Sequence, residues 1–192
     1  MLALLAWLSS ALPVAAEETP GSERPLELQP YRVLIAVGFR SEATLTPRFR
    51  RQVIGEIGRI CDRNVYQMWD IRIEQASGTA PGDEASLQRM ESDSVAASIE
   101  NAATDLDKVF FTTVASSGSH YVVATREWDV ATRRLGAVYS QSTPARSRIA
   151  DTVVRVVTKA FRPVLSIESV EGETATLRLR AAAYPPADPD AA

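Results

Sequence analysis

The first pattern along the chain is an uncharged apolar run at its start. Residues 1–16 (MLALLAWLSSALPVAA) carry no charge, and Glu17 and Glu18 follow directly. A short apolar core that ends in small residues, here Val14 and Ala16, is typical of a secretory signal peptide. A membrane-spanning helix needs about 20 apolar residues. We therefore expect cleavage after Ala16 and no transmembrane helix in the mature chain.

After this run, strand and helix periodicities alternate. Residues 31–39 and 69–74 predict strands, because apolar and β-branched residues dominate the first and alternate in the second. Thr46 and Pro47 predict the start of a helix that continues to about residue 64. Residues 87–106 predict either one kinked helix or two short ones. The remaining expected elements are strands at 108–116, 120–128 and 137–143, a turn over 129–136, a helix capped by Ser147 and stopped by Pro163, and a β hairpin with strands at 164–170 and 174–180.

The order β-α-β-α-β-β-β-α, followed by a hairpin, predicts an α/β (α+β) fold. We expect a mixed sheet with three helices packed on it, with strand 108–116 central and the first two strands parallel. The expected segments are a signal peptide (1–16), an extended leader (17–30), the α/β domain (31–163), the hairpin (164–184) and a disordered tail (185–192). An alternative is that the hairpin begins a further module of a larger envelope protein.

Composition restricts the cellular compartment in which we expect to find the protein. The 192 residues carry a net charge of −3, which argues against general nucleic-acid binding. Cys61 is the single cysteine, so no intramolecular disulfide can form. An exported chain without disulfides fits a bacterium better than a eukaryotic secretory route. We therefore expect a periplasmic or extracellular bacterial protein.

One strand end resembles a known family. Residues 126–132 (REWDVAT) close a predicted strand, and Gly136 precedes the next. This arrangement is similar to the N-terminal domain of the Tol-Pal translocation protein and to related periplasmic and outer-membrane assembly proteins, in which an Asp-x-x-Thr-Gly turn ends a strand. Asp129 and Thr132 match, whereas three residues separate Thr132 from Gly136. The resemblance covers the architecture of residues 31–161 and implies a non-enzymatic domain that docks on other envelope proteins.

We find no catalytic or metal-ligating pattern in the sequence. His120 is the single histidine, so a zinc site built from histidine and cysteine is excluded. Ser117 and Ser119 lie beside it in a predicted turn, a poor geometry for a nucleophile and its base. We interpret Cys61 as a small hydrophobic residue of a helix face, and the acidic residues between 83 and 107 as solvated. No enzyme activity, metal or cofactor is expected.

Candidate contact residues come from charge and aromatic patterns. Arg51, Arg59 and Arg63 share one face of the predicted helix, which would suit an anionic envelope component. Local pairing, such as Glu56 with Arg59, is the simpler interpretation. Trp128 either closes the core or contacts a partner. An open sheet edge would favour β-augmentation by a partner peptide.

Two functional hypotheses follow. The first is an exported, non-catalytic interaction or scaffold domain of the bacterial cell envelope, a monomer or weak dimer that binds an envelope protein or an anionic component. The second is a secreted hydrolase that uses a carboxylate pair. A pocket that holds two carboxylates about 5–10 Å apart would favour the hydrolase.

Overall fold

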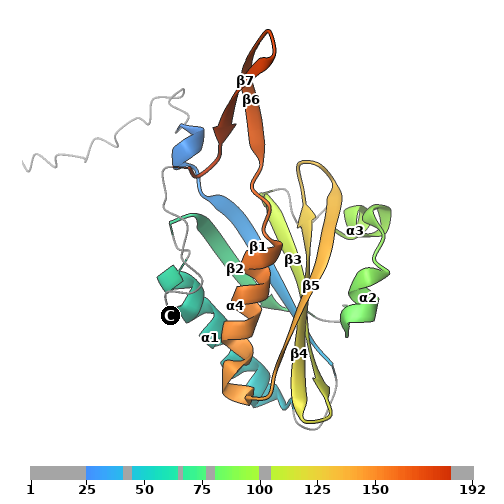
Figure 1. The fold of residues 1–192 in the computed structure, drawn as a ribbon. Helices are drawn as coiled ribbons and strands as arrows, with labels where there is room; N and C mark the ends of the chain where they lie inside the picture. The colour runs from blue at the N-terminus through green and yellow to red at the C-terminus, as the bar shows by residue number, and fades with distance from the viewer. Residues whose placement is uncertain (1–24, 41–44, 65–66, 77–80, 100–104, 183–192) are drawn as a thin grey trace, which may run out of the picture.

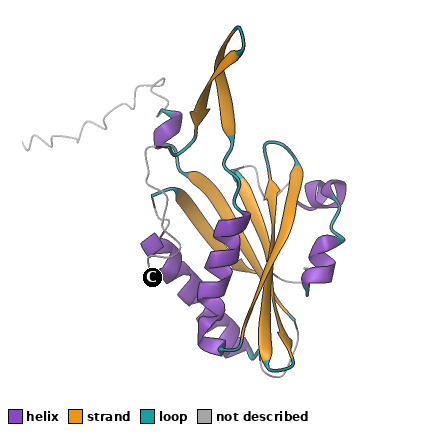
Figure 2. Cartoon of the chain, viewed as in Figure 1, coloured by secondary structure: helices purple, strands orange, loops and turns teal. Residues whose placement is uncertain are grey.

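The computed structural model describes residues 25–40, 45–64, 67–76, 81–99 and 105–182. A mixed sheet lies between two layers of helices, and a hairpin projects beyond one end of the sheet (Figures 1 and 2). The α/β fold expected from the sequence is thus observed. The expected signal peptide, most of the leader and the C-terminal tail lie outside the described residues.

The large sheet has five strands in the order β2-β1-β3-β4-β5. Its strands are β1 (Tyr31–Phe39), β2 (Trp69–Gln75), β3 (Lys108–Ser117), β4 (His120–Asp129) and β5 (Arg134–Thr143). β1 runs parallel to both β2 and β3, and β3, β4 and β5 form an antiparallel meander. The expected central position of β3 and the parallel first two strands are confirmed, and β2 and β5 form the edges.

The turn between β4 and β5 is shorter than expected. We expected it to span residues 129–136, but β5 already begins at Arg134, which pairs with Asp129. Asp129 Oδ1 accepts hydrogen bonds from the backbone N–H of Thr132 at 2.7 Å and from its hydroxyl at 2.8 Å. Arg133 then adopts a left-handed conformation with φ 53°, which reverses the chain at once. The Asp-x-x-Thr pattern therefore acts as a local turn cap.

The helices cover the two faces of the sheet. α1 (Pro47–Asn64) and α4 (Ile149–Ala160) pack together on one face, and α2 (Glu84–Gln88) and α3 (Ser92–Ile99) lie on the other (Figure 1). The two short helices resolve the alternative left open for residues 87–106, and they bring the α-helices of the described chain to four. The expected Ser147 cap is wrong. Ser147 lies in the short 3-10 helix η2 (Arg146–Arg148), and α4 starts without a side-chain cap.

Two apolar clusters hold these layers together. The larger lies between the sheet and α1 and α4, and it contains Val33, Phe110 and Val153, all fully buried. The smaller lies under α2 and α3 around Val109 and Trp128. Because both faces of β1 and β3 are covered, these strands carry nearly continuous apolar runs, which explains why they were readily predicted.

The hairpin consists of β6 (Leu165–Glu171) and β7 (Thr174–Leu179), joined around Gly172 at φ 60°. Both strands lie within one residue of their expected positions. The 3-10 helix η1 (Leu26–Leu28) lies beside the end of β7, where the Ala181 N–H donates to Leu26 O at 3.1 Å. None of the helices within the described ranges is long and apolar enough to cross a membrane.

Candidate functional site

A buried lysine lies where the sheet meets the hairpin. Lys108, the first residue of β3, is 1% exposed. Its Nζ donates hydrogen bonds to Glu127 Oε1 at 2.5 Å, to Asp129 Oδ2 at 2.5 Å and to the Arg162 carbonyl at 2.7 Å. An ammonium group has three N–H donors, so all three are used. The lysine thereby ties β3 and β4 to the segment that leads into the hairpin.

The two carboxylates around Lys108 differ in their environment. Glu127 is 2% exposed and its Oε2 has no hydrogen-bond partner among the described residues. Burial raises the pKa of Glu127, and Lys108 only partly opposes this effect. Burial also acts on Asp129, but hydrogen bonds from Lys108 and Thr132 outweigh it and hold the pKa of Asp129 below its ordinary value. The buried cluster therefore contains one carboxyl that favours its proton and one that favours its charge.

The raised pKa of Glu127 predicts a pH dependence of stability. Above the ordinary glutamate value of 4.5 the unfolded chain releases this proton before the folded chain does. The stability that Glu127 contributes is therefore full below about 4.5 and is lost as the pH rises through the folded pKa. We expect Glu127→Gln to remove this loss, so that the free energy of unfolding falls less, or rises more, above pH 4.5 than in the unmodified chain. Urea titrations between pH 4 and 8 measure the slope. Identical slopes in both proteins would contradict the assignment.

Asp129 provides the matched control. Its lowered pKa contributes stability that is present above the ordinary aspartate value of 3.8 and lost as the pH falls through the folded value. Asp129→Asn should therefore reduce the fall in the free energy of unfolding that accompanies acidification. This effect appears at a lower pH than the Glu127 effect, and it concerns stability lost as the pH falls, whereas Glu127 concerns stability lost as the pH rises. The same urea titrations, extended below pH 4, separate the two carboxyls.

A hollow of about 570 Å³ opens beside this cluster. Its wall joins the β4–β5 turn to the segment that enters the hairpin, and it combines charged with apolar side chains. The lining residues are Lys108, Glu127, Asp129, Thr132, Arg134, Leu135, Gly136, Arg162, Pro163, Val164 and Leu165. A Cβ at Gly136 would lie 3.5 Å from the Glu127 Cβ, an ordinary contact distance, so Gly136 packs directly against Glu127 in this wall.

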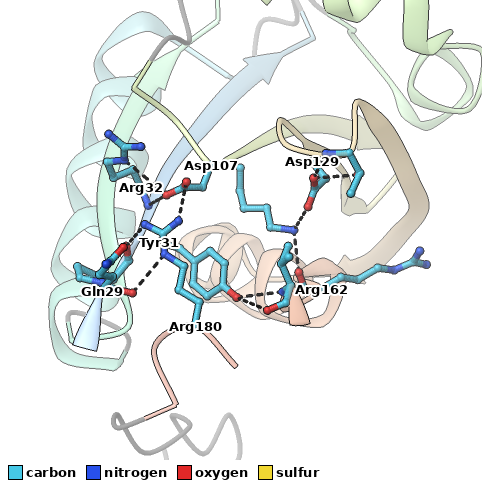
Figure 3. A network of polar contacts seen from close by, with 11 residues as sticks. Gln29, Tyr31, Arg32, Asp107, Asp129, Arg162 and Arg180 are labelled. Atoms are coloured by element: carbon cyan, nitrogen blue, oxygen red, sulfur yellow. Dashed lines mark hydrogen bonds and ion pairs between the residues drawn. The ribbon is translucent and has the colours of Figure 1, made fainter. Parts of the chain in front are cut away.

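Tyr31 fixes the strand that leaves the domain. Its hydroxyl accepts a hydrogen bond from the Val164 N–H at 3.0 Å and donates to the Val164 carbonyl at 3.5 Å (Figure 3). Its ring packs edge-on against Phe161 with the centroids 5.0 Å apart. The residue directly before β6 is thus bound on both backbone groups by a side chain from β1.

Arg180 fixes the strand that returns. Its guanidinium donates to Asp107 Oδ1 at 2.7 Å, to the Pro30 carbonyl at 2.8 Å and to the Gln29 carbonyl at 3.3 Å (Figure 3). It also lies 5.1 Å from the centre of the Tyr31 ring, a cation–π contact. We call Tyr31, Asp107, Lys108 and Arg180 the hairpin root, because they fasten both ends of the hairpin to the sheet.

Beyond this root, one face of the hairpin is apolar and uncovered. Leu165 pairs with Leu179, Ile167 with Leu177 and, after a bulge, Val170 with Ala175. Because side chains alternate along a strand, these six residues share one face, which we call the apolar hairpin face. Four of its side chains are more than half exposed: Leu165 (54%), Ile167 (67%), Val170 (65%) and Leu177 (51%). The opposite face carries Ser166, Thr176 and Arg178.

The candidate residues named from the sequence lie elsewhere. Arg51, Arg59 and Arg63 are exposed on α1. Arg59 forms an ion pair with Glu56, and the Arg63 Nε donates to the Arg59 carbonyl at 3.3 Å, as the local interpretation expects. Trp128 is 2% exposed within the smaller core cluster, so its ring faces the interior.

Cys61 provides a direct test of its interpretation as a core residue. It is 1% exposed on α1, and burial raises the pKa of its thiol to about 12. Since the thiolate is the reactive form, we expect no modification of the folded chain by an aromatic disulfide reagent at pH 8 and full modification in urea. Reaction of the folded chain at the rate of the unfolded chain would contradict this expectation.

The hairpin root was missed in the sequence, although one signal was present. Lys108 opens an apolar strand, and Glu127 lies one residue before a buried tryptophan. Charged residues at such positions are almost never fully buried unless they are paired. In the antiparallel pair Lys108 lies opposite Asp129, with Glu127 two residues along, so a search for opposite charges on paired strands would have found this cluster. His120, by contrast, is exposed at its turn, as expected, with Nδ1 3.0 Å from Ser119 Oγ. Within the described ranges no group of three or more His, Cys, Asp or Glu side chains could hold a metal ion.

Comparison with known proteins does not assign the chain. No family model matches it, and neither does any curated protein. Among solved structures, protein VC0702 from Vibrio cholerae aligns over 67% of this chain and 73% of its own at 9% identity, with a TM-score of 0.31. A PelC dodecamer from Paraburkholderia phytofirmans, carrying a single substitution, aligns over 68% of this chain and 87% of its own at 10% identity, with a TM-score of 0.37. TolB from Acinetobacter baumannii aligns over 79% of this chain and 36% of its own at 14% identity, with a TM-score of 0.34. These scores are low and assign neither a family nor a function.

Proposed function

We propose that this chain is an exported, non-catalytic interaction module of the bacterial cell envelope that binds a protein through its hairpin. The apolar hairpin face carries the proposal. A protein partner fits this face better than an anionic envelope component does, because the face presents aliphatic side chains and no charge. Export and the envelope location rest on the signal-like residues 1–16 and on the resemblance at residues 126–132.

The uncovered face is energetically unusual. An isolated two-stranded hairpin is marginally stable in water, because it has nothing against which to bury its apolar side. Here four large aliphatic side chains of one hairpin remain more than half exposed. Contiguous apolar patches of this kind mark interaction sites. The root fastens both strands, so the face is held in place before a partner arrives, which lowers the entropy lost on binding.

Site-specific photo-crosslinking in living cells tests the proposal. A crosslinking side chain at Ile167 lies on the apolar hairpin face, and one at Thr176 lies on the opposite face as the matched control. We expect a defined protein adduct at Ile167 that is absent at Thr176. The adduct partner, once identified and purified, should bind the unmodified chain and fail to bind Leu177→Ser. Equal adducts at both positions, or none, would refute the proposal.

A carboxylate hydrolase is the second candidate, because Glu127 and Asp129 both line the hollow. Their bonded oxygens each lie 2.5 Å from the same nitrogen, so these two oxygens are no further apart than twice that distance, at or below the separation of about 5–5.5 Å in retaining glycosidases. Their pKa values are also shifted apart, as an acid and a nucleophile would require.

Two observations favour a structural role for this pair. Lys108 lies between the two carboxylates and bonds to both, and the unpartnered Oε2 of Glu127 is closed to solvent. A substrate would have to displace a buried lysine to reach either oxygen. We expect no turnover of polysaccharide or ester substrates by the purified chain. Turnover that is abolished by Glu127→Gln and by Asp129→Asn would establish the hydrolase instead.

A further inference from the structure

We infer that the occupant of the apolar hairpin face is a second copy of this chain, packed antiparallel so that the tip of each hairpin reaches the root of the other. The inference rests on the proposed function, because it names the partner of that face.

The apolar hairpin face has a shape that can pack against the same face of a second copy. Large residues occupy its root half, where Leu165 and Ile167 oppose Leu179 and Leu177, and smaller ones occupy its tip half, where Val170 opposes Ala175. In an antiparallel stack the large half of one face meets the small half of the other. Two-fold dimers require such a self-complementary patch, and two sheets that pack face to face interdigitate in this way.

Charge along the hairpin favours the same direction. Glu173 lies in the tip turn beside Gly172 and is exposed, whereas Glu171 pairs with Thr174 on the opposite face. Arg134 and Arg162 are exposed at the opposite end, in the wall of the hollow. Glu173, Arg134 and Arg162 form no ion pair within the part of the chain that the structure describes. A parallel stack would place acid against acid, whereas an antiparallel stack places each acidic tip against the partner's arginines.

The hollow supplies the receiving surface. Leu165 belongs both to the apolar hairpin face and to the wall of the hollow, so the two are continuous. Leu135, Pro163 and Val164 add further apolar wall. The two acids in this wall, Glu127 and Asp129, are both bonded to Lys108, and Arg134 and Arg162 give the wall an excess of basic residues that favours an incoming carboxylate. Figure 1 shows the hairpin projecting clear of the sheet, so two antiparallel hairpins leave the two domains at opposite ends.

A charge-swap experiment on the full mature chain tests this arrangement. The tip variant carries Glu173→Arg, and the root variant carries Arg134→Glu and Arg162→Glu. Sedimentation equilibrium should show a reversible dimer for the unmodified chain and self-association weakened at least about tenfold for each variant alone. An equal mixture of the two variants should form a one-to-one dimer, because both tip–root contacts are again between opposite charges. No dimer in the unmodified chain, or no recovery in the mixture, overturns the inference.

Two further variants separate this contact from other modes of self-association. Ile167→Ser with Leu177→Ser, on the apolar hairpin face, should abolish the dimer in every background. Ser166→Asp, on the opposite face, should leave it unchanged. Circular dichroism and thermal melting confirm that each variant folds. A dimer that survives the double serine change lies elsewhere, and the inference is then wrong.

The outcomes also separate this inference from the proposed function. If the chain stays monomeric while Ile167 captures a different envelope protein in cells, the function stands and the second-copy partner is refuted. If the chain dimerises as described and the captured protein is the same chain, both stand. If no protein is captured and the charge-swapped mixture does not associate, both fail.

Discussion

Lys108→Met is expected to destabilise the fold by about 3–5 kcal/mol, because it leaves two carboxylates buried without their cation. Glu127 and Asp129 each depend on the Lys108 ammonium for a hydrogen bond at 2.5 Å, and the side chains of Lys108 and Glu127 are 1% and 2% exposed. The loss also frees the Arg162 carbonyl that fastens the hairpin. Urea unfolding of the variant measures the change in free energy, and amide exchange of β6 and β7 measures the loosening of the root.

Companion variants distinguish an unpaired charge from a lost side chain. Lys108→Met with Glu127→Met should recover part of the loss, since a buried ion pair replaced on both sides by apolar groups is often tolerated. Arg72→Met is the control, because Arg72 and Asp105 form an ion pair in which both side chains are more than half exposed. Such pairs contribute about 1 kcal/mol or less. Equal losses in Arg72→Met and Lys108→Met would contradict the importance of burial.

The elements that follow a single strong periodicity were predictable from the sequence. β1 and β3 are covered on both faces, so their apolar runs are unambiguous, and α1 begins at Pro47 as its Thr-Pro start signal indicates. The hairpin was found because Glu171-Gly172-Glu173 is a strong turn signal between alternating segments. In each case the information lies within the segment itself.

The parts that the sequence left open or missed depend on contacts between distant segments. Residues 84–99 form two short helices whose connection is held from β4, because the Arg126 guanidinium donates to the carbonyls of Leu87 and Met90 at 2.8 and 3.0 Å. The start of β5 depends on the left-handed Arg133. The hairpin root joins residues 133 positions apart, as between Tyr31 and Val164. No local pattern encodes such pairs, so the site became visible only with the fold.

The hairpin root also affects how the hairpin is interpreted, because it attaches the hairpin to the α/β domain. From the sequence, an alternative was that residues 164–184 begin a further module. In the structure both strands are fastened to β1 and β3 by side chains that the α/β domain supplies. This fastening, together with the uncovered apolar hairpin face, supports the docking role proposed above.

Arg180→Met is expected to loosen the hairpin while the sheet remains intact. The variant keeps most of the aliphatic stem but loses the hydrogen bonds to Asp107, Gln29 and Pro30 and the contact with the Tyr31 ring. Arg180 is 19% exposed and Asp107 18%, so these bonds are partly shielded from water. We expect the local opening free energy of the hairpin to fall by about 2–3 kcal/mol, which speeds its amide exchange roughly 30- to 150-fold.

Hydrogen exchange at a chain concentration below the dimer range measures this effect without interference from self-association. Exchange in β6 and β7 should accelerate, whereas exchange in β1 and β3 should change little, because Arg180 lies outside both apolar clusters. Arg178→Met is the matched control on the same strand. Arg178 is 49% exposed and pairs with Glu27 and Glu168 on the polar face, so its loss should alter exchange only slightly. If the two variants accelerate exchange equally, the hairpin is held by general charge on β7, and the root has no special role in presenting the apolar hairpin face.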